Sequence, residues 1–170
     1  MVALQVQEVV AKEQLLNMKN SLLYIFVLLS FSSFSQDTLA ELLDKHNRQS
    51  IPYISVNDLA ELKSQTNLLD AREPAEYNVS HLQNAIYVGY DNFKLESLDT
   101  LDKQAKIVVY CSIGYRSEKI GEKLLNKGFK NVSNLNGGIF NWSNNGYKIY
   151  TISGLTEEVH GYSKSWSKWL

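Results

Sequence analysis

The amino-acid sequence predicts an α/β domain of three layers, with a mainly parallel central sheet of about five strands and helices on both faces. Short apolar runs that suit strands alternate along the chain with segments in which apolar residues recur at helical spacing. The run 106–110 is apolar and β-branched at its centre, as expected of a strand that helices cover on both faces. The 170 residues, 44% of them hydrophobic, suit one domain.

The expected strands are short and are separated by turns or helices. In chain order they cover 53–55, 67–70, 85–88, 106–110 and 131–135. The run 106–110 has the strongest pattern and is therefore expected to be the central strand. The run 131–135 is expected to be the last strand of the chain.

Helical spacing of apolar residues predicts three helices around these strands. They lie within 36–50, over 59–63 behind a cap at Ser55 or Asn57, and over 117–127 with an end at Gly128. The main domain is expected to cover 51–150.

The C-terminal stretch 151–170 is expected to be a helical tail. Trp166 and Trp169 are three positions apart, so that one face of such a helix would carry both indoles. Two interpretations stay open: the indoles pack on the domain, or they form a docking peptide for an unidentified protein partner.

The N-terminal region has the pattern of a targeting segment. Residues 18–35 combine a positive start, an apolar centre and small residues before Gln36, which predicts a signal peptide cleaved after Ser35. Residues 1–17 are interpreted as a start-site extension, with Met18 as the true start. The apolar centre is shorter than the ~20 residues that span a bilayer, so no stable membrane insertion is expected after cleavage. We expect a periplasmic or secreted protein; the alternative is an uncleaved membrane anchor.

Charge and composition exclude several partners. The 17 basic and 18 acidic residues leave a formal charge of -1, which offers no field for nucleic acid or an anionic membrane. The histidines His46, His81 and His160 are dispersed, so no metal site is expected. No organic cofactor is expected either.

Cys111 is the single cysteine and follows directly after the strand 106–110. A residue at the carboxyl end of a parallel strand faces the crevice where ligands bind. Gly114 permits a turn whose backbone N–H groups point inward, and a helix that begins near Ser117 adds its own free N–H groups. Such a setting favours the nucleophilic thiolate. The alternative is a small buried hydrophobe that continues the strand.

The loop after this strand therefore carries the predicted site. Cys111 is the expected catalytic nucleophile. Arg116 supplies a permanent positive charge that attracts an anionic donor or holds the loop. The residues expected to bind substrate are Ser112, Ile113, Gly114, Tyr115, Arg116 and Ser117.

Four segments together resemble the rhodanese superfamily, over about Ile54 to Trp142. They are 111–117, similar to Cys-x-x-Gly-x-Arg-Ser; 70–77, similar to Asp-x-Arg-x-x-x-Glu-Tyr; 81–85, similar to His-Ile-Pro-Gly-Ala; and 135–142, similar to Gly-Gly-x-x-x-Trp. The chain departs from the family at Gln83 and Asn84, where Pro-Gly is usual. Asparagine tolerates left-handed backbone, so the turn is expected to survive.

The resemblance implies a rhodanese-like fold and a sulfurtransferase whose Cys111 takes a sulfane sulfur from thiosulfate or a persulfide. A thiol or cyanide then accepts the sulfur, so the implied partners are a small sulfur-donor anion and a thiol acceptor. The resemblance also implies that Asp70, Arg72 and His81 hold loops around the site.

Two other functions stay open at this point. The first is a non-catalytic module of the same fold that binds an envelope partner. The second is a phosphatase or arsenate reductase of a related type, whose loop is one residue longer than the four residues between Cys111 and Arg116. The shorter loop favours a sulfur atom over a phosphate group.

Overall fold

The computed structural model describes Gln14, Asn17, Met18 and residues 39–170. The predicted start-site extension, the signal peptide and its cleavage before Gln36 lie almost wholly outside the described residues. The described residues 39–170 belong to a single unit. Among the described helices, none combines the length and the apolar character that a bilayer crossing needs.

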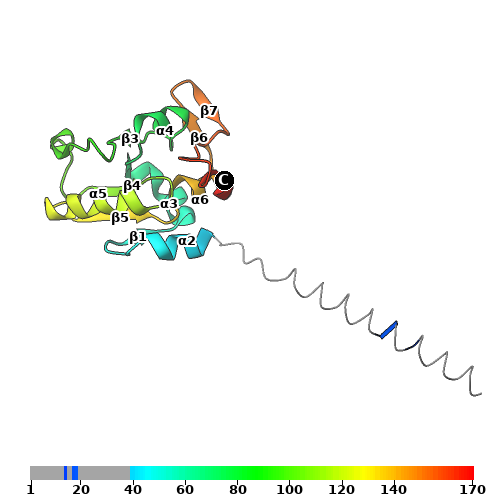
Figure 1. Ribbon diagram of the computed structural model, residues 1–170. Coiled ribbons are helices and arrows are strands. Elements are labelled where there is room, and N and C mark those ends of the chain that lie inside the picture. The colour runs from blue at the N-terminus through cyan, green and yellow to red at the C-terminus, as the bar shows by residue number, and fades with distance from the viewer. Residues whose placement is uncertain (1–13, 15–16, 19–38) are drawn as a thin grey trace, which may run out of the picture. The chain divides into compact units, whose positions relative to one another are not determined.

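Five short strands form one parallel sheet (Figure 1). They are β1 (Tyr53–Ile54), β2 (Asn67–Asp70), β3 (Ile86–Tyr87), β4 (Lys106–Tyr110) and β5 (Asn131–Leu135). Their order across the sheet is β1-β5-β4-β2-β3, and each neighbouring pair is parallel. The predicted fold class is confirmed, and so is the central place of β4.

Helices cover both faces of this sheet, because β4 sends its side chains alternately to two hydrophobic cores. The helices are α2 (Leu39–His46), α3 (Val56–Leu62), α4 (Pro74–Val79), α5 (Tyr115–Asn126) and α6 (Gly138–Asn144). Ile107 and Val109 pack in one core with residues of α5. Val108 and Tyr110 pack in the other core with residues of α3 and α6. The three-layer arrangement follows from this alternation.

The helix α5 begins at Tyr115, two positions before the predicted start at Ser117. The difference arises at Gly114, whose φ of 113° and ψ of -16° turn the chain directly from the loop into the helix. This left-handed conformation is open to glycine and costly for other residues. As a result, Arg116 belongs to the first turn of α5 and its position is set by the helix.

Two other local predictions agree with the structure. Ser55, one of the two suggested caps, accepts the backbone N–H of Asp58 at 3.1 Å, and α3 begins directly after it. Asn84 has a φ of 61°, so this asparagine does take the left-handed conformation that the turn needs. The short helices α4 and α6 were not predicted.

The predicted helical tail at 151–170 is wrong. β6 (Ile149–Thr151) and β7 (Gly154–Thr156) form an antiparallel hairpin, and a 3-10 helix at Ser167–Trp169 follows. β-branched residues favour these strands, and Gly154 takes a φ of 135° after the turn. The strand β5 is therefore not the last of the chain. Trp166 and Trp169 do pack against the core that contains Val108.

Candidate active site

The loop that contains Cys111 joins the central strand β4 to α5, at the carboxyl edge of the sheet. Two backbone hydrogen bonds from the beginning of α6 hold this loop. The N–H of Ile139 donates to the carbonyl oxygen of Cys111 at 2.9 Å, and the N–H of Phe140 donates to the carbonyl oxygen of Ser112 at 3.2 Å. A Cβ atom at Gly138 would collide with the carbonyl oxygens of Cys111 and Ser112. Glycine at this position therefore allows α6 to approach the loop closely.

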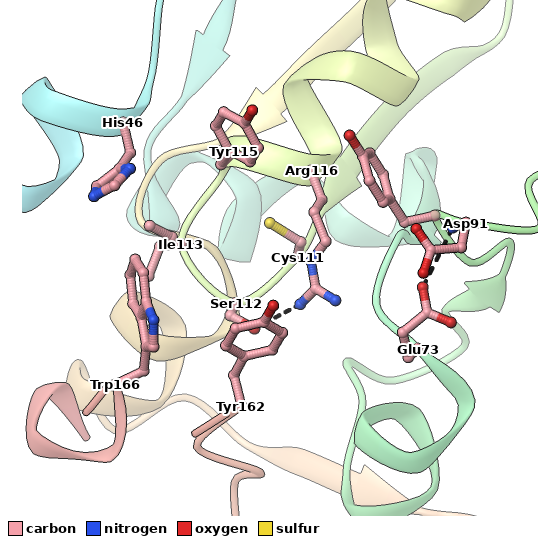
Figure 2. Close-up of a pocket in the computed structure, with 11 residues that line it drawn as sticks. His46, Glu73, Asp91, Cys111, Ser112, Ile113, Tyr115, Arg116, Tyr162 and Trp166 are labelled. Carbon is pink, nitrogen blue, oxygen red and sulfur yellow. Dashed lines mark hydrogen bonds between the residues drawn. The ribbon is translucent and has the colours of Figure 1, made fainter. Parts of the chain in front are cut away.

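Cys111 lines a cavity of about 330 Å³, and Figure 2 shows its side chain among the other lining residues. Cys111 is 1% exposed, yet it belongs to the cavity lining. The backbone N–H of Gly114 donates to its Sγ atom at 3.1 Å. The interpretation of Cys111 as a plain core residue does not fit this geometry, since the sulfur faces both an amide hydrogen and the cavity.

Buried amides hold the loop in this shape. The side-chain amide of Asn134 on β5 donates to the carbonyl oxygen of Gly114 at 2.8 Å. The hydroxyl of Ser117 donates to Oδ1 of Asn134 at 2.7 Å, and Asn47 donates to the carbonyl oxygen of Ile113 at 3.2 Å. Ser117 is fully buried and is not among the residues that line the cavity, and its observed contacts support the loop.

Arg116 is bound to a carboxylate that belongs to the resemblance motif at 70–77 but was not among the predicted site residues. Its two terminal nitrogens donate to the two oxygens of Glu76 on α4, both at 2.7 Å. Ser112 joins the pair, because its hydroxyl donates to Oε1 of Glu76 at 2.9 Å. The same hydroxyl accepts from Nη2 of Arg116 at 3.0 Å (Figure 2). The arginine therefore holds the cysteine loop to α4.

This pairing decides the charge state of both groups. Burial by itself would raise the pKa of Glu76, but the hydrogen bonds and positive charge of Arg116 outweigh it and hold the pKa below its usual value. Burial would lower the pKa of Arg116, but the carboxylate of Glu76 and the nearby Cys111 outweigh burial and raise it. Both groups are thus ionised, and each compensates the charge of the other.

Only some of the predicted site residues line this cavity. Its lining consists of Cys111, Ser112, Ile113, Tyr115 and Arg116 from the predicted loop, and of His46, Glu73, Tyr90, Asp91, Tyr162 and Trp166 from elsewhere. The second group comes from four separate segments, and of its members only Trp166 was singled out from the sequence, as one of the two tail indoles. Gly114 contributes through its N–H to Cys111 and not through the lining.

The tail closes one side of the cavity with aromatic rings. The guanidinium of Arg116 lies 5.0 Å from the centre of the Tyr162 ring. The rings of His46 and Trp166 lie 5.5 Å apart. Figure 2 shows Tyr162 and Trp166 beside the loop that carries Cys111. The tail and α2 therefore meet at the cavity mouth.

Asp70, Arg72 and His81 lie outside the cavity lining. Asp70 and Arg72 form a fully buried ion pair at 2.7 Å, and Arg72 also donates to the carbonyl oxygen of Ser80. The ring of His81 stacks on that of Tyr77 at 4.2 Å. These contacts connect β2, α4 and the segment after it, which agrees with the loop-holding role that the resemblance implies. Within the described residues, no group of histidine, cysteine or acidic side chains is arranged to hold a metal ion.

Comparison with known families decides the identity of this arrangement. The family model of the Rhodanese-like domain matches residues 55–145, which is more than half of the chain and includes the whole cysteine loop. The chain belongs to the rhodanese-like domain family. The tail residues Tyr162 and Trp166 and the α2 residue His46 lie outside the matched range of this rhodanese-like domain.

Two curated relatives of this rhodanese-like chain are tRNA uridine(34) hydroxylases. The protein from Hamiltonella defensa is 38% identical over 97 residues, which cover 53% of this chain and 27% of the relative. The protein from Yersinia enterocolitica is 41% identical over 83 residues, which cover 46% of this chain and 24% of the relative. The chain thus spans about a quarter of the length of these relatives.

Solved structures show the same fold. A rhodanese-related protein from Thermoplasma volcanium superposes with a TM-score of 0.50 at 29% identity, covering 58% of this chain and 97% of the other. A thiosulfate sulfurtransferase from Pseudomonas aeruginosa superposes with a TM-score of 0.54 at 24% identity, covering 69% of this chain and 23% of the other. The latter likeness concerns the fold alone.

Proposed function

We propose that this rhodanese-like domain is a sulfurtransferase that carries a sulfane sulfur on Cys111. The observation that carries the proposal is the setting of Cys111, which lines a cavity and whose Sγ accepts the backbone N–H of Gly114 with an N–S distance of 3.1 Å. A sulfur atom bound to Sγ extends into this cavity, beside the start of α5. Amide hydrogens and the positive end of a helix stabilise the negative charge of a persulfide.

The proposed cycle has two displacement steps. The thiolate of Cys111 attacks the outer sulfur of a donor, thiosulfate or an organic persulfide, and the donor leaves as sulfite or a thiolate with the electron pair of the broken S–S bond. A thiol or cyanide then attacks the outer sulfur of the Cys111 persulfide. The bond between the two sulfurs breaks, and its electron pair returns to Sγ. No external oxidant or reductant is needed.

An intact-mass measurement tests the proposal. After incubation with either thiosulfate or a small persulfide, the protein is expected to gain the mass of one sulfur atom, and cyanide is expected to remove it as thiocyanate. Cys111→Ser should gain no sulfur. An unmodified thiol after both donors would contradict the proposal and favour the binding-module function.

Loop length also separates this proposal from a phosphatase. Arg116 follows Cys111 after four residues and is already bound to Glu76, which leaves its guanidinium poorly placed to bind a phosphate ester. We expect no hydrolysis of a chromogenic phosphate ester above that of Cys111→Ser.

The activity named for the curated relatives is not extended to this chain. The match covers about a quarter of their length, and the formal charge of -1 offers no general attraction for RNA.

Export is proposed on the signal-peptide pattern of 18–35. Mass analysis of the protein from the host cell envelope would support this if the chain begins at Gln36.

A further inference from the structure

We infer that the cavity over Cys111 selects persulfides and thiols that carry a cationic amine, and disfavours anionic donors and acceptors such as thiosulfate. This inference rests on the proposed sulfur transfer and adds the substrate class. Three features of the cavity support it: the charge of Arg116 is already compensated, two carboxylates stand at the cavity wall, and the remaining wall is largely aromatic.

The first feature removes the obvious anion-binding group. Both terminal nitrogens of Arg116 are bound to Glu76 at 2.7 Å, and Nη2 also donates to Ser112. Since Glu76 is 3% exposed in its side chain and ionised, its charge cancels that of the arginine at short range. An anionic substrate therefore meets an ion pair and not a free cation.

The second feature makes the cavity acidic. Glu73 and Asp91 both line it, from the start of α4 and from the loop after β3. An oxygen of Glu73 accepts the backbone N–H of Asp91 at 3.3 Å, which holds the two residues together (Figure 2). In the part of the chain that the structure describes, no cationic side chain forms a salt bridge with either carboxylate. The wall thus carries two carboxylates that no salt bridge among the described residues neutralises, and Glu73 also accepts a backbone N–H at the start of α4.

The third feature gives a cation further favourable contacts. Tyr90, Tyr115, Tyr162 and Trp166 all contribute to the cavity wall. The faces of aromatic rings attract cations, and one such contact exists between Arg116 and Tyr162. The cavity of about 330 Å³ is at the small end of ligand pockets, which suits a small organic aminothiol.

The experiment compares three thiol acceptors of similar size with different charges. Cys111 is first converted to the persulfide. Sulfur transfer is then followed to three acceptors: cysteamine, 2-mercaptoethanol and 3-mercaptopropionate. The pH is about 8, at which an ordinary histidine imidazole is uncharged. The measured quantity is the ratio of kcat/KM for the cationic thiol to that for the anionic thiol. Intrinsic thiol reactivity cancels when this ratio is compared between wild type and variants.

The test variant is Glu73→Gln with Asp91→Asn, which keeps the size of both side chains and one acceptor oxygen of each while it removes both charges. We expect the ratio to fall about tenfold, because two charges within a Debye length of the substrate are removed. The matched control is Glu96→Gln with Asp99→Asn, two exposed carboxylates outside the cavity lining, for which the ratio should stay that of wild type.

The outcomes separate this inference from the proposed function. Failure of Cys111 to form a persulfide would overturn both. A persulfide that passes sulfur to all three thiols, with a ratio that the Glu73 and Asp91 changes leave unaltered, would overturn the charge selectivity alone. A tenfold fall in the test variant, absent from the control, supports it.

Discussion

The guanidinium of Arg116 and the carboxylate of Glu76 face each other through two N–O contacts of 2.7 Å, although the residues are 40 positions apart in the chain. This pair connects α5, which follows the cysteine, to α4 on a different part of the chain. It also explains why Arg116 is ionised and yet offers little net charge to a substrate. Several consequences of the arrangement are open to experiment.

Glu76→Gln is expected to reduce the free energy of unfolding by about 2 kcal/mol, because the charge of Arg116 is left without compensation. The expected loss of unfolding free energy is smaller than the loss for a fully buried ion pair, since the arginine side chain is 13% exposed. Urea unfolding measures the change. Glu96→Gln, at an exposed position, is the control and should change stability little. An equal effect of both changes would show that the pair does not stabilise the fold.

Acid should weaken the same pair. The pKa of Glu76 in the folded protein lies below its ordinary value of 4.5, so its contribution to stability is complete above pH 4.5 and is lost as the pH falls through the folded pKa. The difference in unfolding free energy between wild type and Glu76→Gln should be constant at higher pH and shrink below 4.5. Urea titrations at a series of pH values check this. A difference that is independent of pH would contradict it.

Gly114→Ala should slow the formation of the Cys111 persulfide. The backbone of Gly114 has a φ of 113°, and a Cβ there would lie 3.0 Å from Nδ2 of Asn47. The strain costs about 1 to 2 kcal/mol and displaces the N–H that donates to Sγ. The rate is measured by intact mass during donor exposure.

Gly128→Ala is the matched control for this change. Its φ is 92° and nothing lies within 4 Å of a Cβ at this position, so the backbone strain is comparable while the cysteine loop is untouched. Persulfide formation per folded molecule should remain that of wild type. A similar loss of rate in both variants would mean that the N–H of Gly114 has no special role.

Trp166→Ala should expose the cavity and accelerate alkylation of Cys111 severalfold. Trp166 lines the cavity and contacts the ring of His46, whereas Trp169 packs against the same core without lining it. Trp169→Ala is therefore the control for lost packing. The rate of reaction with iodoacetamide under native conditions measures access to the thiol. Equal rates in the two variants would show that the tail does not restrict the cavity.

Local patterns were sufficient for the strands of the parallel sheet and for the place of Cys111 in the chain. The bounds of β2, β4 and β5 follow from short apolar runs, and a run with two buried faces belongs at the centre of a parallel sheet. The place of Cys111 at the end of β4 follows from chain connectivity alone. The start of α5 was predicted two residues late, because the left-handed turn at Gly114 has no helical periodicity.

The tail shows how local patterns fail. Two tryptophans three positions apart suggested a helix over 151–170, but the chain forms a hairpin and then packs both indoles on the core through a mostly irregular segment. Helical hydrogen bonds there are confined to the short turns within 163–170, and hydrophobic contact with the domain positions the indoles. Two residues at helical spacing are too few to specify a helix.

By itself, the sequence determined the fold class, the order of the sheet strands along the chain, and the loop that presents Cys111, because each depends on neighbours in the chain. Only the tertiary structure decided the electrostatics of the site. The pairing of Arg116 with Glu76 and the placement of Glu73 and Asp91 at the cavity bring together residues from separate segments. Charge interactions depend on distance in space, and distance in space is set by packing of the whole domain.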